Sequence, residues 1–297
     1  MGPLGVRLPT LAARMSYAPP VRRHTPQVYR VRRALLATAV VLVAAAGWQL
    51  VAGGEEDAAP PVTSTSTSTT LPALPTCVDD PAQDVVTGMD PRQQWATIRV
   101  DTQVMLPAGY GPPDLHNISE AGFPLTEGVA LRGFVMDDLS ALREGAAANG
   151  TPIRIIAAYR SFQSQEDLFG RRVDELGASE AGSRVARPGH SEHQLGTTID
   201  VTSEGMTDVD QSWGASPAGQ WIAGHAHEYG FLLSYPAEAS ASTCYDFEPW
   251  HLRYVGRDHA AIVIANRLTL REYLWNLEQG VTYPPPTTST TTTTTAP

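Results

Sequence analysis

The feature that most limits what this chain can fold into is a pair of Thr/Pro-rich segments on either side of its middle. Residues 60–76 read PPVTSTSTSTTLPALPT, and residues 284–297 form a similar run near the other end. Ser, Thr and Pro at this density bury too little apolar surface to fold. We therefore predict a linker over residues 54–76, one folded domain over residues 77–281, and a disordered tail over residues 282–297.

An apolar run without charges precedes the first of these segments. Residues 34–52 read ALLATAVVLVAAAGWQLVA, and about 20 such residues can cross a bilayer as a helix. Arg30, Arg32 and Arg33 stand just before the run, so the positive-inside rule predicts a cytoplasmic basic tail over residues 1–33. We expect a single-pass membrane anchor over residues 34–53, with the folded domain outside the cytoplasm. A cleaved signal peptide is the alternative, because the run also contains small residues.

The charge of the chain bears on its partners. Seven of its 21 basic residues, all of them Arg, precede residue 34, and no acidic residue does. The rest of the chain then has 14 Arg against 31 acidic residues, a formal charge of −17. Because nucleic-acid binding requires neutralisation of phosphates, this balance argues against such a partner. We expect a monomer.

The two cysteines lie far apart in the sequence, Cys77 at the start of the predicted domain and Cys244 in its last third. Two cysteines without CxxC spacing do not make a thiolate metal site. A single disulfide is expected if the domain is exported to an oxidising compartment, and two free buried thiols are the alternative.

Periodicity predicts a mixture of helices and short strands. Apolar residues at helical spacing predict helices over residues 129–147, 164–176, 217–229 and 258–267, followed by a helix that Thr269 and Glu272 cap. Short β-rich runs predict strands over residues 152–158, 197–202, 231–234 and 252–255. The order has no regular βαβ rhythm, so we predict an α+β fold with a small central, mostly antiparallel sheet and flanking helices.

The stretch PGHSEHQLGTTIDVT, residues 188–202, contains a histidine seven residues before an aspartate. Gly196 interrupts any helix between them, so His193 belongs to a loop and Asp200 to the following strand. A carboxylate on a rigid strand is a suitable hard ligand for a metal. On their own, the two residues fit an exposed strand face and a loop histidine better than a metal site.

A second short motif, EPWH, strengthens the metal hypothesis. Glu248 and His251 flank Pro249, which excludes a helix interior. Catalytic zinc sites use three protein ligands and leave one position for water. We predict that His193, Asp200 and His251 bind Zn²⁺ and that Glu248 is the general base.

Other polar residues can complete such a site. Arg160 lies two residues after the strand predicted at residues 152–158 and could stabilise an oxyanion or bind a substrate carboxylate; a structural ion pair is the alternative. We predict Ser191, Tyr159 and Trp250 as substrate contacts. His190 is expected at the rim of the site rather than among the ligands.

The quoted motifs resemble a known family. YRSFQSQ, PGHSEHQLGTTID and EPWHLRYVG are similar in content and order to the VanY-type D-alanyl-D-alanine carboxypeptidases, subfamily B of peptidase family M15. The resemblance implies the zinc D,D-peptidase fold that is shared with the Hedgehog signalling domain. It implies the same three ligands and the same base, with Arg160 as transition-state stabiliser and Gln165 as a further substrate contact. Ser234 departs from the family pattern, which often has Arg there.

The resemblance also implies a substrate. It predicts a metallopeptidase that removes the terminal D-alanine of peptidoglycan stem peptides by means of a metal-activated water. An L,D-carboxypeptidase that acts on tetrapeptide stems is an alternative on the same scaffold. A non-catalytic cell-wall-binding domain of the same fold is the alternative from another functional class.

Overall fold

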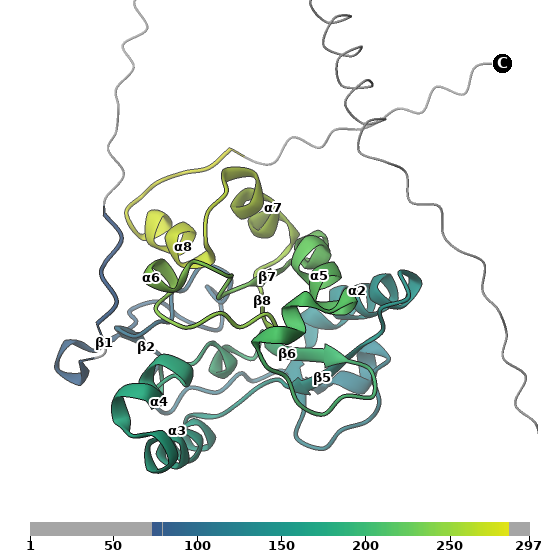
Figure 1. Ribbon diagram of the computed structural model, residues 1–297. Coiled ribbons are helices and arrows are strands. Elements are labelled where there is room, and N and C mark those ends of the chain that lie inside the picture. Colours follow the sequence, from purple (N-terminus) through teal and green to yellow (C-terminus); the bar gives the residue numbers. More distant parts are fainter. Residues whose placement is uncertain (1–72, 79, 285–297) are drawn as a thin grey trace, which may run out of the picture. The chain divides into compact units, whose positions relative to one another are not determined.

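The computed structural model of this chain describes residues 73–78 and 80–284 (Figure 1). The predicted basic tail, the predicted anchor and most of the linker lie outside the described residues, as does nearly all of the C-terminal tail. Among the residues that are described, no helix has both the length and the apolar character needed to cross a bilayer.

The centre of the domain is a four-stranded sheet in the order β5-β6-β8-β7. All neighbouring strands are antiparallel, which confirms the predicted α+β class and the antiparallel sheet. The four strands are β5 (Ile153–Ala157), β6 (Thr198–Ser203), β7 (Phe231–Leu233) and β8 (His251–Tyr254). They agree with the strands predicted from the sequence to within one or two residues at each end.

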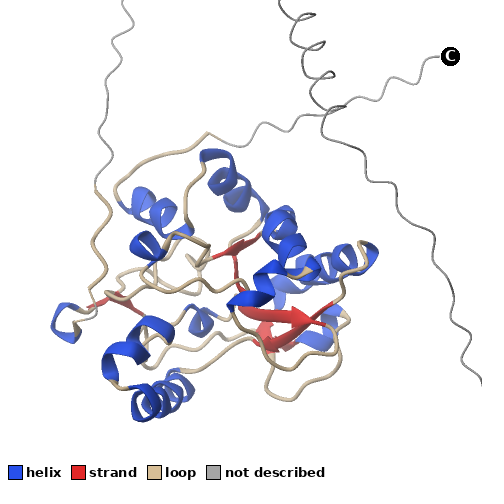
Figure 2. Ribbon diagram, viewed as in Figure 1, coloured by secondary structure: helices blue, strands red, loops and turns tan. Residues whose placement is uncertain are grey.

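Helices surround this sheet (Figure 2). They are α2 (Met136–Ala148), α3 (Phe162–Leu176), α4 (Ala178–Arg184), α5 (Pro217–His225), α6 (Ser240–Thr243), α7 (Arg257–Asn266) and α8 (Leu270–Glu278). Thr269 forms a capping box with Glu272 at the start of α8, as predicted. Ser161 caps α3 and Ser216 caps α5. The short helices α4 and α6 carry too few apolar residues to be recognised from periodicity.

The predicted helix over residues 129–147 begins later than expected. Its first part is the strand β4 (Ala130–Arg132), which pairs with β3 (Leu115–Asn117), and a 3₁₀ turn, Gly133–Val135. The prediction was wrong there because the alternation of Val129 and Leu131 fits both periods over so short a stretch. A further two-stranded ribbon, β1 (Val85–Val86) with β2 (Val104–Met105), is parallel and was not predicted.

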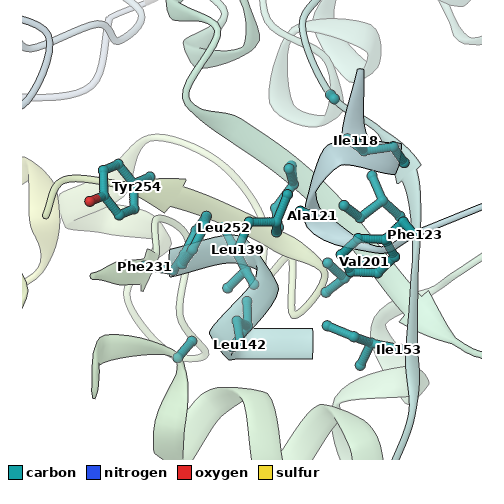
Figure 3. Close-up of a cluster of buried hydrophobic side chains, with 14 of the residues drawn as sticks. Ile118, Ala121, Phe123, Leu139, Leu142, Ile153, Val201, Phe231, Leu252 and Tyr254 are labelled. Atoms are coloured by element: carbon teal, nitrogen blue, oxygen red, sulfur yellow. The ribbon is translucent and has the colours of Figure 1, made fainter. Parts of the chain in front are cut away.

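The main core lies between the sheet and the helices α2 and α5. Leu139 and Leu142 of α2 contact the apolar cluster that contains Ile199, Val201 and Leu252 of the sheet (Figure 3). On β7, Phe231 belongs to this cluster, whereas Leu232 packs with residues of α7 and α8 in a second one. Successive side chains of a strand point to opposite faces, so the sheet is covered on both faces at β7.

A disulfide between Cys77 and Cys244 ties the start of the domain to the loop before the EPWH motif. The two Cα atoms are 5.1 Å apart although the residues are separated by 167 positions. This settles the alternative left open by the sequence in favour of the bridge. Closing a loop of this length restricts the unfolded chain and typically stabilises a domain by about 2–4 kcal/mol.

A buried ionic cluster joins the same region to the C-terminal helix. Asp101 is 2% exposed, and its Oδ2 accepts from Arg99 Nη1 at 2.5 Å and from Arg271 Nε at 2.6 Å. Arg271 also donates to the carbonyls of Pro75 and Ser242. Burial by itself would raise the pKa of Asp101, but the two guanidiniums outweigh it and hold the pKa below its ordinary value.

Replacing this carboxylate should therefore destabilise the domain in a pH-dependent way. Asp101→Asn leaves the buried guanidinium of Arg271 without a carboxylate partner and leaves Arg99 with Glu278 alone. Breaking a buried pair of this kind costs about 3–5 kcal/mol. A depressed pKa contributes stability that is present above the ordinary carboxyl value of about 3.9 and is lost as the pH falls through the folded value. Urea unfolding of the two proteins at several pH values should show a large difference at pH 7 that shrinks below about pH 4. A constant difference over this range would contradict the ion-cluster explanation.

Candidate metal centre

The three predicted ligands converge on one point of the sheet. Asp200 on β6 and His251 on β8 are directly opposed partners in the antiparallel register. Their side chains therefore lie on the same face of the sheet. His193 comes from a 3₁₀ turn, Glu192–Leu195, which ends at the left-handed Gly196 just before β6. One ligand atom from each residue lies within 4.8 Å of the others.

Hydrogen bonds on the outer side of each imidazole fix which nitrogen faces the centre. His193 Nδ1 lies 2.7 Å from the carbonyl oxygen of Ala158, which can only accept, so this nitrogen carries the proton. Its Nε2 then faces Asp200 at 3.3 Å. His251 donates from Nε2 to a carboxylate oxygen of Glu192 at 3.0 Å, so its Nδ1 faces Asp200, also at 3.3 Å.

These residues fit a divalent cation such as zinc. Asp200 Oδ1 is buried and accepts no hydrogen bond, which is unusual for a buried carboxylate oxygen and is explained if it binds a metal. Two imidazole nitrogens and one carboxylate form a common catalytic zinc set. Burial lowers the pKa of His193, which favours the neutral ring that a metal ligand needs. The three side chains are thus arranged to bind a cation.

Glu248 lies beside the three ligands without belonging to them. It precedes β8 in a turn that is fixed by its own N–H bonded to Tyr235 O and its C=O bonded to His251 N–H. Its Oε2 is 3.5 Å from His251 Nδ1, and its side chain is 15% exposed. Burial, helped by the neighbouring carboxylates Asp200 and Glu192, raises the pKa of Glu248 to about 8. A cation at the ligands would lower this pKa.

Arg160 presents its guanidinium to the same site from the loop between β5 and α3. Its backbone N–H donates to the His193 carbonyl, and its Nη1 donates to Gln165 Oε1 at 2.9 Å. Gln165 is 1% exposed, and its amide nitrogen donates to Ala186 O. Gln165 therefore orients Arg160, while the substrate contact that the resemblance implies for it stays a prediction.

A cavity of about 270 Å³ contains this chemistry. Its lining includes all three ligands, Glu248 and Arg160, together with the predicted contacts Gln165, Ser191 and Trp250. Tyr159, the remaining predicted contact, is not among the lining residues. The side chains of Asp208, Tyr235 and Tyr245 also line the cavity and were not predicted, because no local spacing relates them to the motifs.

Two residues of the motif PGHSEH have positions that the sequence did not indicate. His190 was expected at the rim, but it is 1% exposed, and its Nδ1 donates to Asp101 O at 2.6 Å. That prediction was wrong because the turn before the ligands folds inward onto residues 101–102. Glu192, between Ser191 and His193, was not singled out at all, yet it contacts a ligand.

The part of the chain that contains this site is similar to known carboxypeptidases. Residues 129–257, which include every proposed ligand and Glu248, match the family described as VanY, D-alanyl-D-alanine carboxypeptidase. The bifunctional D-Ala-D-Ala dipeptidase and D-Ala-D-Ala carboxypeptidase VanXYC of Enterococcus gallinarum is 36% identical over 132 residues, or 43% of this chain and 70% of that protein. The chain spans just under two thirds of the length of curated relatives from Bacillus subtilis and Enterococcus faecalis, 65% and 66%.

Solved structures share the fold. The L,D-carboxypeptidase LdcB is 34% identical with a TM-score of 0.53, and the match covers 59% of this chain and 83% of that chain. A mutant of the vancomycin-resistance D,D-pentapeptidase VanY, solved with Zn(II), is 28% identical with a TM-score of 0.52. The match covers 61% of this chain and 99% of that chain. With the family model matched over residues 129–257, a relative 36% identical over 70% of its length and the fold shared with solved structures, the chain belongs to the VanY D-alanyl-D-alanine carboxypeptidase family.

Proposed function

We propose that this protein is a zinc-dependent D-alanyl-D-alanine carboxypeptidase that removes the terminal D-alanine from peptidoglycan stem peptides. The observation that supports this most is the convergence of His193, Asp200 and His251 with Glu248 and Arg160 in one cavity. The relatives named for this activity, and the Zn(II) complex of one of them, support the choice of metal and substrate.

His193, Asp200 and His251 would hold the metal. Zinc supplies Lewis acidity, which makes a water more acidic and polarises the scissile carbonyl. Glu248 is close enough to the ligands to take the proton of the attacking water and deliver it to the leaving amine. Arg160 places a permanent positive charge in the same cavity, where it can stabilise the oxyanion or the terminal carboxylate of the substrate.

A second activity, L,D-carboxypeptidase on tetrapeptide stems, is favoured by one observation. The L,D-carboxypeptidase LdcB is 34% identical to this chain, against 28% for the D,D-pentapeptidase VanY. Both reactions would use the same proposed ligands, base and Arg160 in this chain, so the stem that the cavity accepts would decide between them.

Mass spectrometry of defined muropeptides distinguishes these activities. The purified full chain is incubated with pentapeptide and tetrapeptide stems, with and without a chelator. We expect loss of one D-alanine from the pentapeptide, and no loss when zinc is removed. Loss from the tetrapeptide alone would identify the L,D activity. Stable substrates that are bound but not cleaved would instead indicate a wall-binding domain.

We also propose that residues 34–53 anchor the protein in the cytoplasmic membrane, with the domain on the outer side. The uncharged apolar run and the three Arg residues before it support this orientation. The disulfide is in keeping with an oxidising compartment. Fractionation of cells followed by protease treatment of intact spheroplasts tests the proposal: the domain should be in the membrane fraction and accessible to the protease.

A further inference from the structure

Glu192 is a buried carboxylate with three hydrogen-bond donors around it. It is 4% exposed. Its Oε2 accepts from Ser234 Oγ at 2.6 Å and from His251 Nε2 at 3.0 Å, and its Oε1 accepts from Arg253 Nη1 at 2.9 Å. Both oxygens are therefore occupied, and one of the donors is a proposed metal ligand.

Arg253 in turn is fixed by the N-terminal part of the domain. Its side chain is fully buried, and its Nη2 donates to the carbonyl oxygens of Trp95 and Ile98 at 3.0 and 2.7 Å. Residues 95 and 98 precede the part of the chain that matches the family, residues 129–257. A continuous set of hydrogen bonds thus runs from this upstream segment through Arg253 and Glu192 to His251.

We propose that Glu192 is a positioning residue that fixes His251 in the tautomer whose Nδ1 is free for the metal, and that Arg253, with the Trp95 and Ile98 carbonyls, fixes Glu192. The inference rests on the proposed zinc site. Carboxylates that accept from the outer nitrogen of a metal-binding histidine fix its ring orientation and increase its basicity.

The chemistry of the three donors requires a carboxylate at this position. Arg253 has only donors, and its Nη1 needs an acceptor at Oε1. His251 needs an acceptor at Oε2 in order to protonate Nε2. A glutamine has one acceptor oxygen, so it places its amide N–H₂ against either Arg253 or His251. If the amide N–H₂ faces Arg253, two donors face each other. If it faces His251, the ring must accept at Nε2 and carry its proton on Nδ1, and this proton blocks binding of the metal.

The test is the zinc affinity of the Glu192→Gln variant of the full chain, measured by competition with a chromophoric chelator. Outer-shell partners of this kind contribute about 10- to 100-fold to metal affinity, and we expect a loss in this range. Ser234→Ala is the matched control, because it removes one donor from Glu192 but leaves its bonds to His251 and Arg253; its affinity should stay within a few-fold of the parent.

A second measurement does not depend on the variant folding. Two-dimensional ¹H–¹⁵N NMR of the zinc-loaded parent should show the His251 ring with a proton on Nε2 and none on Nδ1. A proton on Nδ1, or unchanged zinc affinity in a folded Glu192→Gln variant, would overturn the proposal. These results are separable from the proposed activity: a parent chain that binds no zinc contradicts the zinc peptidase itself, whereas normal zinc binding by the variant contradicts only the role of Glu192.

Discussion

The Glu248→Gln variant should lose hydrolysis of muropeptides by about 10²- to 10⁴-fold, the range in which general acid–base catalysis contributes. Glutamine has nearly the same size as glutamate but cannot take a proton from water. Glu248 lies 3.5 Å from His251 Nδ1 yet is not needed as a ligand, so zinc should remain bound. The measurement is kcat on the preferred stem peptide together with the zinc content of each protein.

A matched control for this variant is Glu127→Gln. Glu127 is exposed in the turn before β4 and does not line the cavity, so its replacement should change neither activity nor zinc content. If Glu248→Gln keeps its full kcat, the assignment of the base is wrong. A loss of zinc along with the activity would mean that Glu248 supports the metal rather than the proton transfer.

The Asp200→Asn variant should lose the metal itself. Asp200 supplies the only negative charge among the three proposed ligands. Its Oδ1 is buried and accepts no hydrogen bond from the protein, as expected of an oxygen that binds the metal. We expect a drop in zinc affinity larger than the 10- to 100-fold typical of outer-shell changes, with activity lost in proportion. Because a ligand that binds only the folded state stabilises it by about 2.7 kcal/mol at 100 times its Kd, zinc should raise the Tm of the parent and not of the variant.

Asp208→Asn provides the comparison within the same cavity. Asp208 lines the cavity but is not one of the clustered ligands, so this variant should bind zinc and respond to it in thermal unfolding as the parent does. The ligand assignment would fail if Asp200→Asn retained the affinity of the parent, or if the two variants lost zinc equally.

Much of the site could be predicted because its parts lie in short, patterned stretches. The alternation in TTIDVT predicts a strand, and the structure has β6 at Thr198–Ser203 with Asp200 on it. Pro249 predicts that the pair Glu248 and His251 is not helical, and the structure has a turn followed by β8. Prediction failed at residues 129–135, where the structure has a strand and a 3₁₀ turn of three residues each. Such short elements do not show whether apolar residues repeat with the period of a strand or of a helix.

The sequence by itself determined the four strands of the central sheet, most of the described helices, and the types of residue that could bind a metal and move a proton. These features depend on composition and on periods of two to four residues, which the linear order contains. Only the tertiary structure decided how Glu192 is used, since its partners His251 and Arg253 are 59 and 61 residues away. The same holds for the bridge between Cys77 and Cys244. Such contacts depend on the register of strands and the packing of whole elements, and a buried carboxylate is stable at this point only because all of its donors arrive together.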